Sequence, residues 1–180
     1  YQPDAIASFE WNGATFILSA NEGDARDYDG FSEEVRVKDI VDPDELNMTL
    51  SPALQAIYDE TGGSDGLGRL KVTTVLGDAD ANGEYEALYS YGARSFTIWD
   101  QHMNLVFDSG DDFGKISAAV LGNDFNSAHT ENKGDNRSDD KGGEPEAIDV
   151  GMIGDRTYAF IGQERAGDLF IYDVTNPFTA

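Results

Sequence analysis

The chain has 180 residues, of which 35 are acidic and 12 basic, so its formal net charge is −23 at pH 7. This charge argues against binding to nucleic acids or to anionic membranes, because both attract Lys and Arg. It suits cation binding, or solubility in a salty medium that screens self-repulsion. The chain has no cysteine, which excludes disulfides, thiolate zinc sites and cysteine nucleophiles. Twenty glycines and an apolar fraction of 39% favour a loop-rich β protein.

Two segments at opposite ends of the chain repeat one another without gaps. Residues 2–6 and 15–18 with Glu22 align with residues 144–148 and 157–160 with Glu164. In a second ungapped match, residues 85–88 and 96–100 align with residues 158–161 and 169–173. The strands at residues 96–100 and 169–173 both end in Asp, and residues 35–39 are a weaker copy of them. Each unit is therefore interpreted as three strands separated by loops, with residues 105–108 as a fourth strand.

Repeated four-stranded antiparallel units are typical of β-propeller blades. We predict that residues 1–180 are a single all-β unit, a partial β-propeller of about three four-stranded antiparallel blades with a short helical insertion. A β-sandwich with coincidentally similar strands is the alternative. Closed propellers have about four to eight blades, so we expect a fragment with open sheet edges, covered by the rest of a parent chain or by a self-associating copy.

Two insertions interrupt the repeats. Residues 49–68 contain one predicted helix, with Ser51 as its N-cap and Pro52 at its first position. Residues 122–143 are almost wholly polar and are predicted to form a long surface loop.

The clearest local motif is a nine-residue loop between two strand-like runs, residues 72–76 and 87–91. Carboxylate or amide oxygens occupy loop positions 1, 3, 5 and 9, and a glycine occupies position 6. Ca²⁺ requires such a set of oxygen ligands from one short loop. Because Tyr89 stands where a helix-loop-helix site has Glu, we predict a calcium loop in a β-hairpin; an acidic turn without an ion is the alternative. The predicted ligands are Asp78, Asp80, Asn82, Glu84 through its backbone carbonyl, and Glu86.

A second candidate site follows from the repeat. In a propeller, equivalent positions of different blades lie on one ring around the central channel. The repeat therefore places Asp4 and Glu146 on one ring, and Glu22 and Glu164 on another. Clustered carboxylates need a cation or raised pKa values, so a divalent metal at the channel is one interpretation and loop caps are the other. A guanidinium beside such a metal would suit phosphate ester chemistry, whereas salt bridges that stabilise loops are the alternative. The candidate catalytic residues are Glu22, Asp24, Arg26, Asp139, Asp140, Glu144 and Glu146.

Six ordered motifs resemble the choice-of-anchor I family: residues 2–6, 21–26, 34–39, 94–100, 106–111 and 137–142. The resemblance implies a secreted or surface-anchored bacterial protein with a propeller fold. Some members are alkaline-phosphatase-like, and some are similar to a mesenchyme-specific cell surface glycoprotein. Two functions therefore stand as hypotheses: a calcium-stabilised, non-catalytic surface or binding module, and part of a metal-dependent phosphoesterase.

Overall fold

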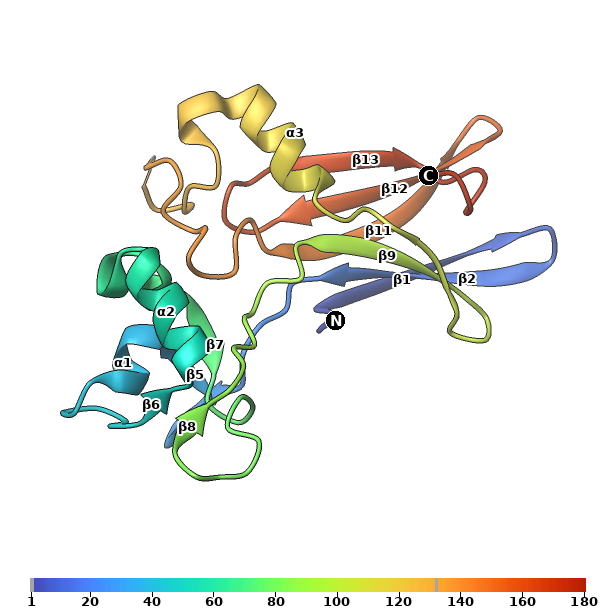
Figure 1. The fold of residues 1–180 in the computed structure, drawn as a ribbon. Helices are drawn as coiled ribbons and strands as arrows, with labels where there is room; N and C mark the ends of the chain where they lie inside the picture. The colour runs from blue at the N-terminus through green and yellow to red at the C-terminus, as the bar shows by residue number, and fades with distance from the viewer. Residues whose placement is uncertain (1, 132) are drawn as a thin grey trace. The chain divides into compact units, whose positions relative to one another are not determined.

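The computed structural model describes residues 2–131 and 133–180 (Figure 1). Within those residues strands predominate, with three α-helices and three short 3₁₀ helices beside thirteen strands. The chain divides into two compact units: unit 1 contains the residues up to Asp24 together with Gly92–Ala180, and unit 2 contains Ala25–Tyr91. The protein is thus mostly β, as predicted. No helix among the described residues is long and apolar enough to span a membrane.

Unit 1 is built on two antiparallel sheets. The first sheet has the order β1-β2-β9-β10, and the second sheet has the order β11-β12-β13. A two-residue turn joins β1 to β2, where Asn12 and Gly13 both have positive φ, as a tight hairpin requires. The strands are β1 (Ala5–Trp11), β2 (Ala14–Asn21), β9 (Ser95–Asp100), β10 (Leu105–Asp108), β11 (Pro145–Ile153), β12 (Arg156–Gln163) and β13 (Leu169–Asp173).

The two sheets and one helix share a hydrophobic core. Leu18 and Ile98 of the first sheet belong to the same buried cluster as Ile161 of the second. Helix α3 (Asp112–Leu121) lies against the second sheet beside β13 (Figure 1), where the ring of Phe113 stacks on that of Phe170 at 4.5 Å. This helix was not predicted from the sequence. A short 3₁₀ helix, η3 (Gly122–Asp124), follows it.

The strand register confirms the internal repeat. Ile6 faces Ser19 in the first sheet, and their aligned partners Ile148 and Ile161 face each other in the second. The third strands, β9 and β13, agree as well. Phe96 pairs with Ala20 in the first sheet, and the aligned residues Leu169 and Gly162 pair with each other in the second. The first ungapped match and the third-strand match therefore describe real structural equivalence.

The expected number of blades was wrong. Residues 85–88 were aligned with a second strand, but β2 occupies that place, because the whole of unit 2 is inserted between β2 and β9. Residues 35–39 are not a copy of the third strand either: β5 ends at Arg36 and helix α1 begins at Val37. Three apparent blades thus reduce, in the described residues, to one four-stranded and one three-stranded sheet, neither of them closed.

Unit 2 has a smaller core that contains Val37, Ile40, Leu50, Val72 and Tyr85. Helix α2 begins after Ser51, whose hydroxyl accepts a hydrogen bond from the Leu54 backbone N–H at 3.4 Å, so the predicted helix and its cap are confirmed. The elements are β3 (Asp27–Tyr28), β4 (Phe31–Ser32), β5 (Glu34–Arg36), α1 (Val37–Val41), β6 (Thr49–Leu50), α2 (Pro52–Glu60), η1 (Gly63–Asp65), η2 (Leu67–Arg69), β7 (Lys71–Thr73) and β8 (Glu84–Tyr85).

Removal of the Phe113 side chain tests the core of unit 1. Because this ring is buried against Phe170 and Phe96, Phe113→Ala should lower the free energy of unfolding by about 3–5 kcal/mol. Val120→Ala on the same helix is the control, since Val120 is exposed and its truncation leaves no cavity. Urea unfolding of both variants measures the difference, and equal losses would contradict the described position of α3.

Candidate functional site

The loop from Asp78 to Glu86 is closed by its own side chains. The Asp78 carboxylate accepts hydrogen bonds from the backbone N–H groups of Asn82, at 3.1 Å, and Gly83, at 2.9 Å. Gly83 has a φ of 89°, a conformation that glycine adopts without strain. Two residues further along the chain, Tyr85 is buried in the core of unit 2, and its hydroxyl lies 3.4 Å from the Thr74 carbonyl oxygen. The loop therefore has a defined shape fixed to a packed core.

Three of the predicted ligands meet in this loop. Carboxylate oxygens of Asp78, Asp80 and Glu86 all lie within 4.8 Å of one another. The Asn82 side-chain oxygen instead accepts a hydrogen bond from the Glu84 backbone N–H at 2.7 Å. Asp80 and Glu86 are exposed to solvent and Asp78 is half-buried.

The strands around this loop are shorter than predicted. β7 ends at Thr73, and residues 87–91 form no strand beyond an isolated bridge between Ser90 and Val72. A hydrogen bond from the Thr73 N–H to the Tyr89 carbonyl, at 3.0 Å, still joins the two ends in antiparallel fashion. The Glu86 and Ala87 N–H groups also donate to the Gly77 carbonyl oxygen, at 2.8 and 3.3 Å. Isolated backbone contacts therefore close the loop in place of the long hairpin that the alternating sequence suggested.

A second carboxylate cluster lies in unit 1, where oxygens of Glu22, Glu144 and Glu164 come within 4.8 Å of one another. Glu22 directly follows β2 and Glu164 directly follows β12, so the two side chains leave equivalent ends of the repeated strands. Glu144 directly precedes β11. The pairing of Glu22 with Glu164, predicted from the repeat, thus agrees with the geometry.

Basic side chains surround the fully buried Glu144. Arg137 forms an ion pair with one of its carboxylate oxygens, and Arg165 Nε donates to the other at 2.9 Å. Lys141 Nζ lies 4.0 Å from the second oxygen and also binds the Asp24 carboxylate. A buried charge is costly unless it is paired and hydrogen-bonded, and here both oxygens of Glu144 are engaged.

The backbone around this cluster is unusual. Glu144 has a φ of 58°, in the left-handed region that a residue with a long side chain rarely adopts. Gly92 has a φ of 80°, and a Cβ there would lie 2.5 Å from the Lys141 carbonyl oxygen, so only glycine allows this close approach. Arg94 holds the same turn, because one of its terminal nitrogens donates to the carbonyls of Ser138 and Asp140 at 3.0 Å each.

The crowded charges shift the pKa of Glu22. Burial, followed by the negative charge of Asp24, raises the pKa of Glu22 from 4.5 to about 7, against the opposing effect of Lys141. Burial also raises the pKa of Glu164, against the opposing effect of Arg165 and with smaller contributions from Glu144 and Glu146 in the same direction as burial. A proton is therefore held in this cluster near neutral pH.

The predicted catalytic residues are only partly brought together. Glu22, Asp24, Asp140 and Glu144 share the ion-pair network of unit 1. Asp139 is half-buried in the same turn, and Glu146 is exposed at the start of β11. Arg26 belongs to unit 2, where its guanidinium binds the buried Glu33 carboxylate at 2.6 Å.

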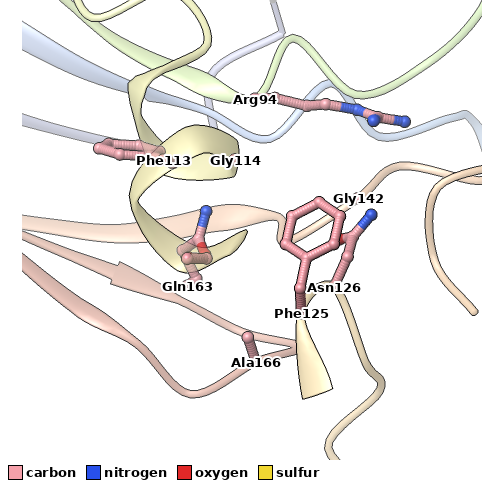
Figure 2. Close-up of a pocket in the computed structure, with 10 residues that line it drawn as sticks. Arg94, Phe113, Gly114, Phe125, Asn126, Gly142, Gln163 and Ala166 are labelled. Carbon is pink, nitrogen blue, oxygen red and sulfur yellow. The ribbon is translucent and has the colours of Figure 1, made fainter. Parts of the chain in front are cut away.

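Arg165 and Arg94 were not among the residues predicted for this site. Arg165 follows Glu164 at the end of a repeated strand, which is a usable signal, whereas Arg94 acts on residues more than forty positions away. The turn containing Gly142 also borders a pocket (Figure 2), together with Arg94, Phe113, Asn126 and Gln163. Its volume of about 50 Å³ suits a few water molecules, because ligand pockets measure about 300–1,000 Å³. The surrounding segment, predicted as a surface loop, thus buries Asn126, Asp140 and Lys141.

The raised pKa of Glu22 predicts a pH-dependent stability. Between pH 4.5 and about 7 the folded state keeps a proton that an unfolded Glu has released, so the free energy of unfolding should fall as the pH rises through this window. Glu22→Gln should remove this part of the slope, and Glu45→Gln, at an exposed position, is the control. Urea unfolding at pH values across the window measures it. A Glu22→Gln slope equal to that of the native chain would contradict the expectation.

Comparison with known proteins places the chain in a family. The sequence model of the choice-of-anchor I domain matches residues 1–177. Gigasin-3a from Magallana gigas is 34% identical over 119 residues, which are 63% of this chain and 42% of that relative, so the match spans less than half of the relative's length. No solved structure matches the chain. The chain belongs to the choice-of-anchor I family, and this membership implies a secreted or cell-surface protein.

Proposed function

We propose that this chain is a calcium-stabilised, non-catalytic surface or binding module of an extracellular protein, built as part of a β-propeller. The observation that carries the calcium proposal is the convergence of Asp78, Asp80 and Glu86 in the loop where the sequence predicts ligands. The repeated register of the two sheets in unit 1 supports the propeller architecture, because both are antiparallel and both align strand by strand.

The charge balance of the loop favours a bound cation. Three carboxylates this close repel one another, and the chain has no Lys, Arg or His between Lys71 and Arg94 to neutralise them. Lys71 itself is paired with Glu34. A divalent ion with a preference for oxygen ligands would remove the repulsion, with water completing the six to eight ligands that Ca²⁺ takes.

The position of the loop favours a structural role for that ion. The last residues of the loop include β8, whose Tyr85 is buried in the core of unit 2, and Glu86 directly follows this strand. The Glu86 carboxylate accepts a hydrogen bond from the Ala79 N–H at 3.0 Å. An ion between Asp78 and Glu86 would therefore link the start of the loop to a strand in the core. Such an ion stabilises the folded chain, since an unfolded chain does not bring the ligands together.

The phosphoesterase alternative has weaker support. It needs a metal with an open coordination position in the cluster of Glu22, Glu144 and Glu164. Both oxygens of Glu144 are already bound by Arg137 and Arg165, so a metal would have to displace them. The adjoining pocket is also too small for an organic phosphoester. These observations favour a structural ion-pair network in unit 1.

Calcium should raise the melting temperature of the chain, and Asp80→Asn should abolish the rise. At a calcium concentration about 100-fold above the dissociation constant, the expected gain is about 2.7 kcal/mol. Asp80→Asn keeps the side-chain shape and removes one charged ligand, whereas Asp155→Asn, in the exposed turn between β11 and β12, removes the same charge elsewhere. Thermal melting followed by circular dichroism measures the shift.

The melts are run at constant ionic strength, because any salt screens a chain with a net charge of −23. Mg²⁺ at the same concentration serves as the second control, since it demands a tighter octahedral geometry. An equal response of Asp80→Asn and Asp155→Asn to calcium would contradict a specific site in this loop.

A further inference from the structure

A buried side-chain amide in unit 1 has no hydrogen-bond partner among the described residues. Gln163, the last residue of β12, is 8% exposed, and it lines the pocket that Arg94 and Gly142 border (Figure 2). Its backbone N–H donates to the Asp168 carbonyl oxygen at 2.9 Å, but no described residue forms a hydrogen bond with its side chain. Buried polar groups nearly always have a partner, so this exception points to a group that occupies the pocket.

The repeat provides an internal comparison, because the residue aligned with this glutamine is Asn21, at the end of β2. The Asn21 amide donates to the Thr97 hydroxyl at 2.7 Å and accepts a hydrogen bond from the Ser19 hydroxyl at 2.9 Å. The residues aligned with these two partners are Phe170 and Ile161, which have no polar side-chain atom. The hydroxyls that satisfy the amide in the first sheet are therefore missing at the equivalent positions of the second.

Two other polar side chains of the pocket also have unused hydrogen-bonding atoms. The Asn126 amide nitrogen donates to the Ser138 hydroxyl at 2.6 Å, and no residue in the described part of the chain donates to its oxygen. Arg94 donates through Nη2 to two backbone carbonyls, and its Nε and Nη1 have no partner within residues 2–131 and 133–180. The pocket thus offers donors and an acceptor in addition to the Gln163 amide.

Two adjacent glycines make room for these polar groups. A Cβ at Gly142 would lie 2.9 Å from Arg94 Nε, and a Cβ at Gly143 would lie 2.6 Å from both polar atoms of the Gln163 amide. Because both distances are shorter than a real Cβ contact, a side chain at either position would displace its neighbour. The two glycines therefore let the guanidinium and the amide lie at the wall of the pocket.

The rest of the wall is largely apolar and the space is small. Phe113, Phe125 and Ala166 line it, and its volume is about 50 Å³. One water needs about 10–15 Å³ of such space, so the pocket has room for about four water positions. An acetamide group has four non-hydrogen atoms: an oxygen that accepts hydrogen bonds, a nitrogen that donates, and two carbons that include an apolar methyl group. Its size and its chemistry both match the pocket.

The charge around the pocket favours a neutral ligand over an anion. Burial lowers the pKa of Arg94, whereas the negative charge of Asp140 raises it, and Asp135 and Glu144 act in the same direction as Asp140. These carboxylates, together with the net charge of −23, would repel an anion that approached the guanidinium. A neutral carbonyl oxygen accepts hydrogen bonds from the same nitrogens without this repulsion.

We propose that this pocket binds the acetamido group of a neutral ligand, such as an N-acetylated amino sugar. The carbonyl oxygen accepts hydrogen bonds from Arg94 and from the Gln163 amide nitrogen, and the N–H donates to the Asn126 side-chain oxygen. The methyl group packs against the rings of Phe113 and Phe125. Binding supplies partners to buried polar atoms that have none in the described chain, which is where a hydrogen bond contributes most. The pocket belongs to unit 1 and the calcium loop to unit 2, so this proposal does not depend on calcium.

Titration of the ¹⁵N-labelled chain with acetamide, followed by NMR, tests the proposal. The side-chain NH₂ signals of Gln163 and the backbone signal of Gly143 should shift, with a dissociation constant in the millimolar range because so small a group buries little area. Gln163→Met keeps the length of the side chain and removes both polar atoms, so it should weaken binding by about tenfold. Gln101→Met is the matched control, because Gln101 is exposed in a turn of the first sheet, and it should bind like the native chain.

Gly143→Ala is a second variant that should fold and lose binding. Gly143 does not have a positive φ, and its new Cβ would displace only the flexible end of Gln163. Circular dichroism checks that each variant is folded. Native binding that is unchanged in both Gln163→Met and Gly143→Ala would overturn the proposal.

Three ligands test the chemistry of the group. N-acetylglucosamine should shift the same signals, whereas glucose, which lacks the acetamido group, should not. A lower dissociation constant for N-acetylglucosamine than for acetamide supports a sugar as the source of the group, and a higher one supports a small free amide. Sodium acetate that binds more tightly than acetamide would show an anion site and overturn the proposal. Signals that stay unshifted by acetamide throughout the millimolar range would show a pocket that holds water alone and overturn it as well.

Discussion

The excess of negative charge is the constraint on which the rest of this structure depends, because 35 acidic residues share 12 basic ones. Unit 1 and unit 2 meet it differently. In unit 1, Arg137, Lys141 and Arg165 gather around the buried Glu144. In unit 2, the loop of Asp78, Asp80 and Glu86 has no basic residue in its own stretch of sequence. Basic side chains of the protein itself balance the negative charge of the first cluster. We infer that a bound metal cation balances the negative charge of the second.

The repeat explains where these clusters arise. Strands of equal register end at equivalent places, so their following residues, Glu22 and Glu164, are brought together. Glu144 enters from the strand that begins there, and its ion pairs tie the ends of β11 and β12 to the turn that contains Arg137. Unit 2 interrupts only the connection between β2 and β9, which leaves the register of the first sheet intact.

Sequence alone predicted the features that are local or that recur. The helix after Ser51, the strand at residues 105–108 and the convergence of three loop carboxylates depend on neighbouring residues, and the two sheets repeat one pattern. Residues 35–39 were misassigned because a short apolar run fits both a strand and a helix; Val37 and Ile40, three apart, are buried on one helical face. The environment of Glu144 combines segments distant in sequence, and no local pattern encodes such a contact.

A crystal structure grown with calcium tests most directly whether the loop of Asp78, Asp80 and Glu86 binds a cation. The expected result is an anomalous peak between Asp78, Asp80 and Glu86, with oxygen ligands at about 2.3–2.6 Å. A peak at Glu22, Glu144 and Glu164 with the loop left unoccupied would contradict it, because the arginines would then have failed to neutralise that cluster. Loop carboxylates turned apart into solvent, with no peak between them, would contradict it equally.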